Sequence, residues 1–118
     1  MKSVEVLGAL SALAQATRLR VYRLLVQQGE SGLAAGEIAA RVSVASATLS
    51  FHLKELSHAG LIRARQDGRF IYYAADFVAM NDLLAYLTEN CCSGDGGTCG
   101  PQMGRHPAPR ASRARLRA

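Results

Sequence analysis

Apolar residues recur with helical spacing over most of the chain that precedes its glycine-rich segment. Val4, Leu7, Leu10 and Leu13 are three residues apart, so they share one side of a helix. The Ala59-Gly60 pair interrupts the pattern, as glycine commonly does just past a helix end. The spacing predicts helices over about 3–14, 17–28, 34–42, 45–58 and 77–90.

The period of the pattern changes to two after the fourth of these helices. Residues 61–66 and 70–74 are strand-like, and they flank an Asp67-Gly68-Arg69 turn that is typical of a hairpin. Asp76 is predicted to cap the last helix. The expected fold is therefore mainly α with a β-hairpin wing, in the order α-α-α-α-β-β-α.

The two short helices before the hairpin carry a pattern with functional meaning. They are joined by a tight link at Ser43-Val44, and the second is apolar on one side and polar on the other. This arrangement is typical of a helix-turn-helix, whose second helix enters the major groove of DNA. With a hairpin directly after it, the segment predicts a winged helix-turn-helix.

Candidate DNA contacts follow from this arrangement. Short hydroxyl side chains reach base edges or phosphates, and cations neutralise phosphates. A solvated helix face beside a plain hairpin is the alternative interpretation. The candidates are Ser46, Thr48, Ser50, Phe51, His52, Lys54, Arg63, Arg65 and Arg69.

Two of these candidates have a second possible role. His52 lies beside the apolar stripe, so it either contacts phosphate or packs as a buried, hydrogen-bonded histidine. Phe51 lies on the outer side of the helix, where it either contacts a thymine methyl group or packs on the wing.

The charge of the chain is unevenly distributed. Residues 1–100 hold nine Lys and Arg and nine Asp and Glu, whereas residues 101–118 hold five Arg and no acid, which accounts for the net charge of +5. A nucleic-acid interface must therefore be argued locally, not from the whole chain. We expect the Arg- and Pro-rich tail, 101–118, to be disordered, with a solubilising or weakly DNA-attracting role.

The amino-terminal segment and the hydropathy exclude other classes of protein. The opening Met1-Lys2-Ser3-Val4-Glu5 lacks the pattern of a signal peptide, and no stretch is long and apolar enough for a membrane span. We therefore expect a cytoplasmic protein without a membrane partner. In that compartment clustered cysteines stay reduced, and they are more often ligands or redox groups than structural disulfides.

Three cysteines follow the last predicted helix: Cys91 and Cys92 are adjacent, and Cys99 lies in a glycine-rich segment. Three thiols that close together suit a soft ion with three sulfur ligands, such as trivalent arsenic or antimony. Methylarsenite needs only two thiols. A zinc or cadmium site would need a fourth ligand, such as His106. A thiol redox switch, incidental cysteines and, remotely, a thiol enzyme also fit the pattern.

Longer motifs in the chain resemble the arsenic-repressor (ArsR/SmtB) family of metal-responsive winged-helix regulators. The resemblance covers roughly residues 5–90, with its elements in family order. These are Ala16-Thr17-Arg18-Leu19-Arg20, Gly36-Glu37-Ile38-Ala39, Thr48-Leu49-Ser50-Phe51-His52-Leu53-Lys54-Glu55-Leu56, Ala59-Gly60-Leu61-Ile62 and Gly68-Arg69-Phe70-Ile71-Tyr72-Tyr73. The family implies a homodimer formed by the first and last helices. It also implies a repressor on a palindromic operator that a metal or metalloid releases.

The chain departs from two common sensor sites of that family. Residues 32–37 contain no cysteine, where many arsenic sensors carry Cys-x-Cys. The last helix offers Asp76, Asp82 and Glu89 but no histidine, whereas zinc sensors use Asp and His there. The cysteines resemble the carboxy-terminal site of a subset of these repressors.

The sequence thus predicts a homodimeric repressor with three regions: a DNA-binding and dimerisation domain (1–90), a cysteine-rich metalloid-sensing segment (91–100) and the tail. The expected partner is double-stranded operator DNA. The expected inducer is As(III) or Sb(III) at Cys91, Cys92 and Cys99. No catalytic residues, no enzyme activity and no required cofactor are predicted. A repressor of the same fold that responds to methylarsenite, zinc, cadmium or oxidation is the alternative.

Overall fold

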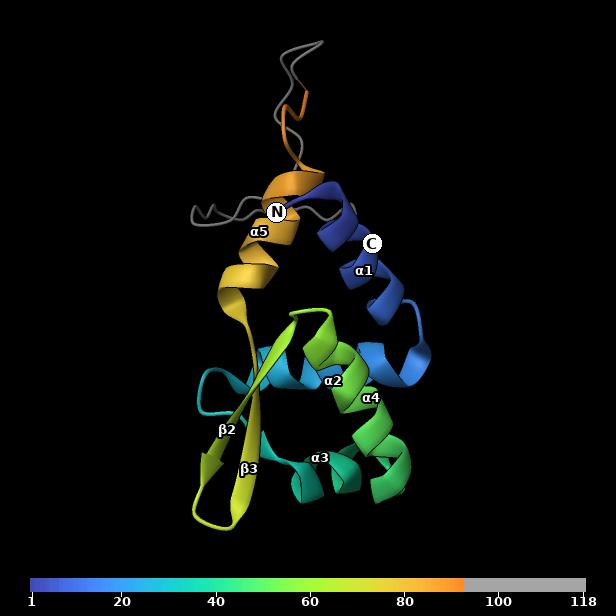
Figure 1. Ribbon diagram of the computed structural model, residues 1–118, viewed down its shortest axis with the longest axis vertical. Coiled ribbons are helices and arrows are strands. Elements are labelled where there is room, and N and C mark those ends of the chain that lie inside the picture. Colours follow the sequence, from blue (N-terminus) through green and yellow to red (C-terminus); the bar gives the residue numbers. More distant parts are fainter. Residues whose placement is uncertain (93–118) are drawn as a thin grey trace, which may run out of the picture. The chain divides into compact units, whose positions relative to one another are not determined.

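A computed structural model describes residues 1–92 of the chain. Residues Met1–Leu87 form one compact unit, and Thr88–Ala118 belong to a second. Figure 1 shows the elements of the first unit, which confirm a winged helix-turn-helix. They are α1 (Ser3–Leu13), α2 (Ala16–Gln28), β1 (Leu33–Ala34), α3 (Ala35–Val42), α4 (Ser46–His58), β2 (Ile62–Asp67), β3 (Phe70–Ala75) and α5 (Phe77–Leu87).

The predicted hairpin is part of a three-stranded antiparallel sheet with the order β1-β3-β2. β2 and β3 pair from Ile62 opposite Ala75 to Asp67 opposite Phe70. β1 was not predicted, because a strand of two residues is too short to show an alternating pattern. It pairs Leu33 with Tyr73 and Ala34 with Tyr72. The base of the wing is thereby tied to the segment that leads into α3.

The core joins the helices to the base of the sheet. The largest fully buried side chains come from α2, α3, α4 and the start of the hairpin: Val21, Leu25, Ile38, Leu49, Leu56 and Leu61. The apolar side predicted for α4 is thus confirmed. In α2, Leu19 is 44% exposed and Val21 is fully buried in the core.

α1 has two apolar sides. Val6, Ala9 and Ala12 are buried against the core, whereas Val4, Leu7 and Leu10 of the repeat seen in the sequence are 72%, 64% and 39% exposed. The repeat therefore predicted the helix correctly, but it marks the side that the protomer leaves uncovered.

α5 begins as predicted and ends earlier. The Asp76 side chain accepts a hydrogen bond from the Ala79 amide at 3.1 Å, which confirms the cap. The helix stops at Leu87 and not at residue 90. Asn90 has a φ of 59°, a left-handed conformation that does not continue an α-helix.

The elements of the first unit divide between two ends. α1 and α5 lie together at one end, and α3, the start of α4 and the tip of the hairpin lie at the other (Figure 1). No helix among residues 1–92 has the length and apolar character needed to cross a bilayer.

Candidate nucleic-acid interface

α4 presents a polar side to solvent because its leucines face the core. Leu49, Leu53 and Leu56 are only 1%, 3% and 0% exposed. The outer side of α4 consists of the exposed residues Ser46, Thr48, Ser50, Phe51 and Lys54. Five of the six candidates on this helix are thus available to a ligand in solution.

The turn before α4 sets its direction. Ser43 adopts a left-handed conformation with a φ of 57°, and the Val44 amide donates a hydrogen bond to the Ala39 carbonyl at 3.1 Å. No side chain caps the start of α4 at Ala45. Its first amide groups therefore carry the partial positive charge of a helix amino terminus, which favours an anion such as phosphate.

His52 lies apart from the other candidates. It is 7% exposed, and its Nδ1 atom is 3.3 Å from Nη1 of Arg18. Because a guanidinium only donates hydrogen bonds, Nδ1 is the acceptor in this pair. The structure thus places His52 in the interior with a protein partner, which matches the second of its two possible roles.

Arg18 is a residue whose role the sequence pattern did not reveal. Its backbone amide bonds to the Gln15 side chain at the start of α2, and its Nε donates to the Ala12 carbonyl of α1 at 2.7 Å. With the contact to His52, this one side chain connects α1, α2 and α4. The pairing spans 34 positions of sequence, so no local pattern signals it.

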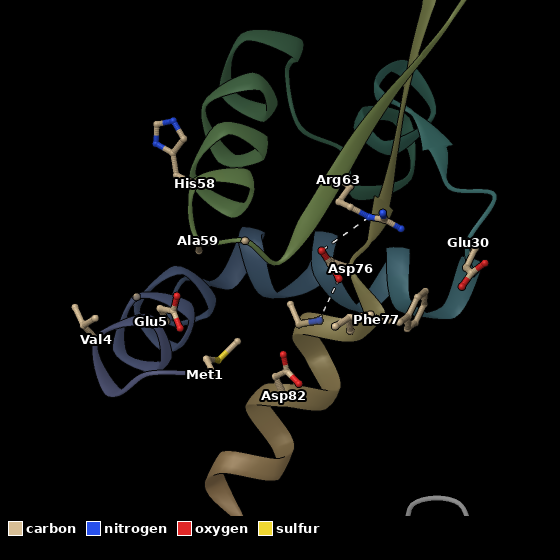
Figure 2. Close-up of a pocket in the computed structure, with 14 residues that line it drawn as sticks. Met1, Val4, Glu5, Glu30, His58, Ala59, Arg63, Asp76, Phe77 and Asp82 are labelled. Atoms are coloured by element: carbon tan, nitrogen blue, oxygen red, sulfur yellow. Dashed lines mark hydrogen bonds and ion pairs between the residues drawn. The ribbon is translucent and has the colours of Figure 1, made fainter.

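The wing carries the three predicted arginines, each in a different setting. Arg63, at the base, lies 3.9 Å from Asp76, and Figure 2 shows this pair beside the start of α5. Arg65 donates to the Ser31 carbonyl at 3.0 Å and stacks over the Tyr72 ring at 5.0 Å. Arg69 is exposed in the turn between the two strands. The wing therefore offers one cation at its tip and two that are already oriented by neighbours.

Of the three cysteines, two lie in the described part of the chain. The Sγ atoms of Cys91 and Cys92 are 3.5 Å apart, and Cys91 is exposed. Cys99, like the arginines of the tail, lies outside the described residues.

Known proteins share this architecture. A family model described as a helix-turn-helix domain matches residues 13–65. A structure described as a possible transcriptional regulator for arsenical resistance is 35% identical, with a TM-score of 0.58. The match covers 67% of this chain and 79% of the other.

The chain belongs to the ArsR family of winged-helix transcriptional regulators. A putative arsenical resistance operon repressor, ArsR of Halobacterium salinarum, is 38% identical over 66 residues, which are 56% of this chain and 50% of that protein. The homodimeric winged helix-turn-helix domain of a possible ArsR-family regulator from Mycobacterium bovis is 28% identical. Its TM-score is 0.58, and the match covers 80% of this chain and 88% of that domain.

The match to ArsR-family proteins is not end to end. The chain spans 65%, 50% and 59% of the lengths of the first three curated relatives. The helix-turn-helix family model matches residues 13–65. The cysteine segment lies outside that range, so we assign it on its own chemistry.

A hollow between α1, α4 and α5 gathers several acidic side chains, as Figure 2 shows. It has a volume of about 740 Å³, and Glu5, His58, Asp76 and Asp82 are among its lining residues. Within residues 1–92, however, no three His, Cys, Asp or Glu side chains come together as metal ligands.

Proposed function

We propose that this protein is a homodimeric repressor that holds a palindromic operator and releases it when trivalent arsenic or antimony binds Cys91, Cys92 and Cys99. Operator binding and metalloid binding are assigned to different regions of the chain. Each assignment rests on its own observations and has its own test.

The observation that carries the DNA-binding proposal is the outer side of α4. Hydroxyl groups of Ser46, Thr48 and Ser50 are exposed on the helix that follows the tight turn. Lys54 lies further along the same helix, and Arg69 is at the wing tip. A helix with short polar groups at its start, flanked by cations, matches the division between base readout and phosphate positioning in helix-turn-helix proteins.

Exposed apolar residues at the α1 and α5 end support the homodimer. Val4 and Leu7 of α1 are exposed, as are Val78 and Leu87 of α5. Uncovered apolar residues that cluster on a small protein are typical of an interface. A two-fold pairing through this end would leave both copies of α4 outward, to meet successive major grooves about 34 Å apart.

The metalloid assignment depends on thiol chemistry. Soft trivalent ions prefer thiolate ligands, and the adjacent sulfur atoms at 3.5 Å provide two donors on one segment. The third donor is Cys99. Three residues separate the end of α5 from this segment in the sequence, so binding there is proposed to change the pairing of the protomers. Release requires that the ligand bind the DNA-free state more tightly than the bound state.

Operator binding is tested first, with the full chain and a duplex selected from a random library. Ser50→Ala and Arg69→Ala are expected to weaken binding measured by fluorescence anisotropy. Loss of one phosphate contact at Arg69 should also lower the slope of log K against log salt by about 0.9. Lys2→Ala, which removes a cation at the α1 end, is the matched control and should leave that slope unchanged. Unchanged affinity and slope in both variants would remove this assignment.

The sensor is tested by titrating the preformed complex with arsenite, antimonite, methylarsenite, zinc and cadmium. Cys91→Ser, Cys92→Ser and Cys99→Ser are each expected to bind operator normally and to lose most of the arsenite response. If methylarsenite is the inducer, two of these variants fail and one still responds. A full arsenite response in the triple serine variant would end the proposal.

A thiol redox switch is a second candidate, because the Sγ atoms of the adjacent Cys91 and Cys92 lie only 3.5 Å apart and Cys91 is exposed. Cysteine oxidation and metalloid binding compete for the same sulfur atoms. Diamide would then release the operator, and dithiothreitol would restore binding. Arsenite release from the fully reduced protein, without any effect of diamide, would favour the metalloid sensor over the switch.

A further inference from the structure

An exposed aromatic ring lies in the middle of the outer side of α4. Phe51 is 55% exposed, whereas Leu49 and Leu53 on either side of it are buried. Each residue turns an α-helix by about 100°, so a residue two positions from both leucines points almost directly away from the core. Phe51 therefore occupies the centre of the surface that faces a ligand of this helix.

The neighbours of Phe51 cover it only in part. Its ring meets the His52 ring edge to face, with centroids 5.5 Å apart and an angle of 64°. His52 is in turn buried and paired with Arg18, which fixes the base of this aromatic contact. Phe51 thus has one aromatic neighbour on its own helix and remains 55% exposed.

The surroundings of Phe51 are polar. Ser50 precedes it, and Thr48 and Lys54 lie three residues away on either side, about one turn of the helix. A ligand for this surface must therefore combine hydrogen-bonding groups and negative charge with a small apolar group near its centre. The floor of the major groove has this composition, since its only apolar group is the C5-methyl of thymine among polar base edges.

We propose that Phe51 contacts the C5-methyl group of one thymine in each operator half-site and makes the protein selective for that base. The inference rests on the proposed DNA-binding function and names a determinant of its specificity. Phe51 lies in the first half of the helix, the part that contacts base edges when a recognition helix enters the groove. The serine hydroxyls position the helix, while the ring excludes water from the methyl group.

The test uses the full chain and the operator selected from a random duplex library. Each thymine is replaced, one at a time, by deoxyuridine, which removes the methyl group and leaves every hydrogen-bonding atom in place. The wild-type protein is expected to lose about fourfold in affinity at one position of each half-site, the effect of leaving one methyl group in water. The other thymines should show no such change.

Variants of Phe51 are then measured on the same pair of duplexes. Phe51→Ala is expected to bind the thymine and deoxyuridine operators equally, and Phe51→Leu to keep part of the preference. Phe70→Ala is the matched control, because Phe70 is an equally exposed phenylalanine, at 61%, on the wing. This variant should keep the full fourfold preference. Circular dichroism and the thermal midpoint establish that the variants fold.

The outcomes separate this inference from the function on which it rests. If the wild-type protein selects no duplex at all, the DNA-binding proposal itself fails. Tight binding without a methyl-sensitive thymine, or a fourfold preference that survives in Phe51→Ala, overturns only the role of Phe51. Loss of the preference in Phe70→Ala but not in Phe51→Ala would transfer the contact to the wing.

Discussion

At the scale of single residues, Arg18 makes the most connections between helices. Its guanidinium bonds to the Ala12 carbonyl and to the buried His52. Arg18→Ala leaves both acceptors without this donor, which is expected to lower the free energy of unfolding by about 1–3 kcal/mol. Urea denaturation measures the change. Arg20→Ala removes an exposed arginine from the same helix and should stay within about 0.5 kcal/mol of wild type. Equal losses in the two variants would contradict this role.

Tyr22 gives a prediction about alkaline pH. Burial, followed by the nearby charge of Asp76, raises the pKa of this phenol above its ordinary value of 10.0. Above that pH the unfolded chain has released the proton and the folded chain still holds it. The contribution of this phenol to the free energy of unfolding is therefore fully present below pH 10. It is lost as the pH rises through the folded-state pKa.

Tyr22→Phe tests this dependence. The buried hydroxyl has no hydrogen-bond partner among the described residues, so the variant should be at least as stable as wild type at pH 7. Its thermal midpoint should fall less steeply than that of wild type between pH 9.5 and 11, a window set around the ordinary tyrosine pKa. Parallel curves for the two proteins would show that the phenol does not titrate with folding.

These residues also mark what sequence can and cannot reveal. The leucines of α4 followed from helical spacing, because burial on one side of a helix repeats locally. The contacts of Arg18 and the open position of Phe51 did not, because each depends on segments far apart in the chain. Position on the helix placed Phe51 on the outer side, and only the packed structure showed that it remains 55% exposed.

At the scale of elements, the short strand β1 holds the wing to the body. Gly32 immediately before it has a φ of 74°, and a Cβ atom there would collide with the carbonyl oxygen of Tyr73. Gly32→Ala should therefore lower the free energy of unfolding by at least about 1–2 kcal/mol. Gly36→Ala is the matched control, since nothing lies within 4 Å of its Cβ position in α3. In the first turn of a helix this change should be neutral or slightly stabilising.

The sheet shows why sequence predicted some elements and missed others. The Asp67-Gly68 turn between two alternating segments indicated the hairpin, and Gly68 has the positive φ of 65° that such a turn requires. β1 consists of two residues with no period of its own. It exists because β3 offers an edge and Gly32 permits the close approach. The end of α5 was overestimated, since its apolar pattern carried no clear stop signal.

At the scale of the whole molecule, pairing of protomers is the central expectation. Leu7 is 64% exposed in the isolated protomer, so Leu7→Asp should leave the fold intact while opposing association. Light scattering is expected to show a folded monomer, with operator affinity reduced at least tenfold. Gln27→Glu adds one negative charge at an exposed position of α2 and should remain dimeric. A monomeric wild-type protein that binds the full palindrome tightly would contradict the two-fold arrangement.

The uncovered side of α1 has a consequence for how a cell would use such a repressor. If only a dimer can bind both half-sites, two protomers must associate before the operator is occupied. When protomers are scarce, operator occupancy then depends on roughly the square of the protomer concentration. Modest changes in synthesis or dilution at cell division would then be amplified at the promoter. An apolar stripe that is covered only when two protomers pair would thereby make repression sensitive to the concentration of the protein.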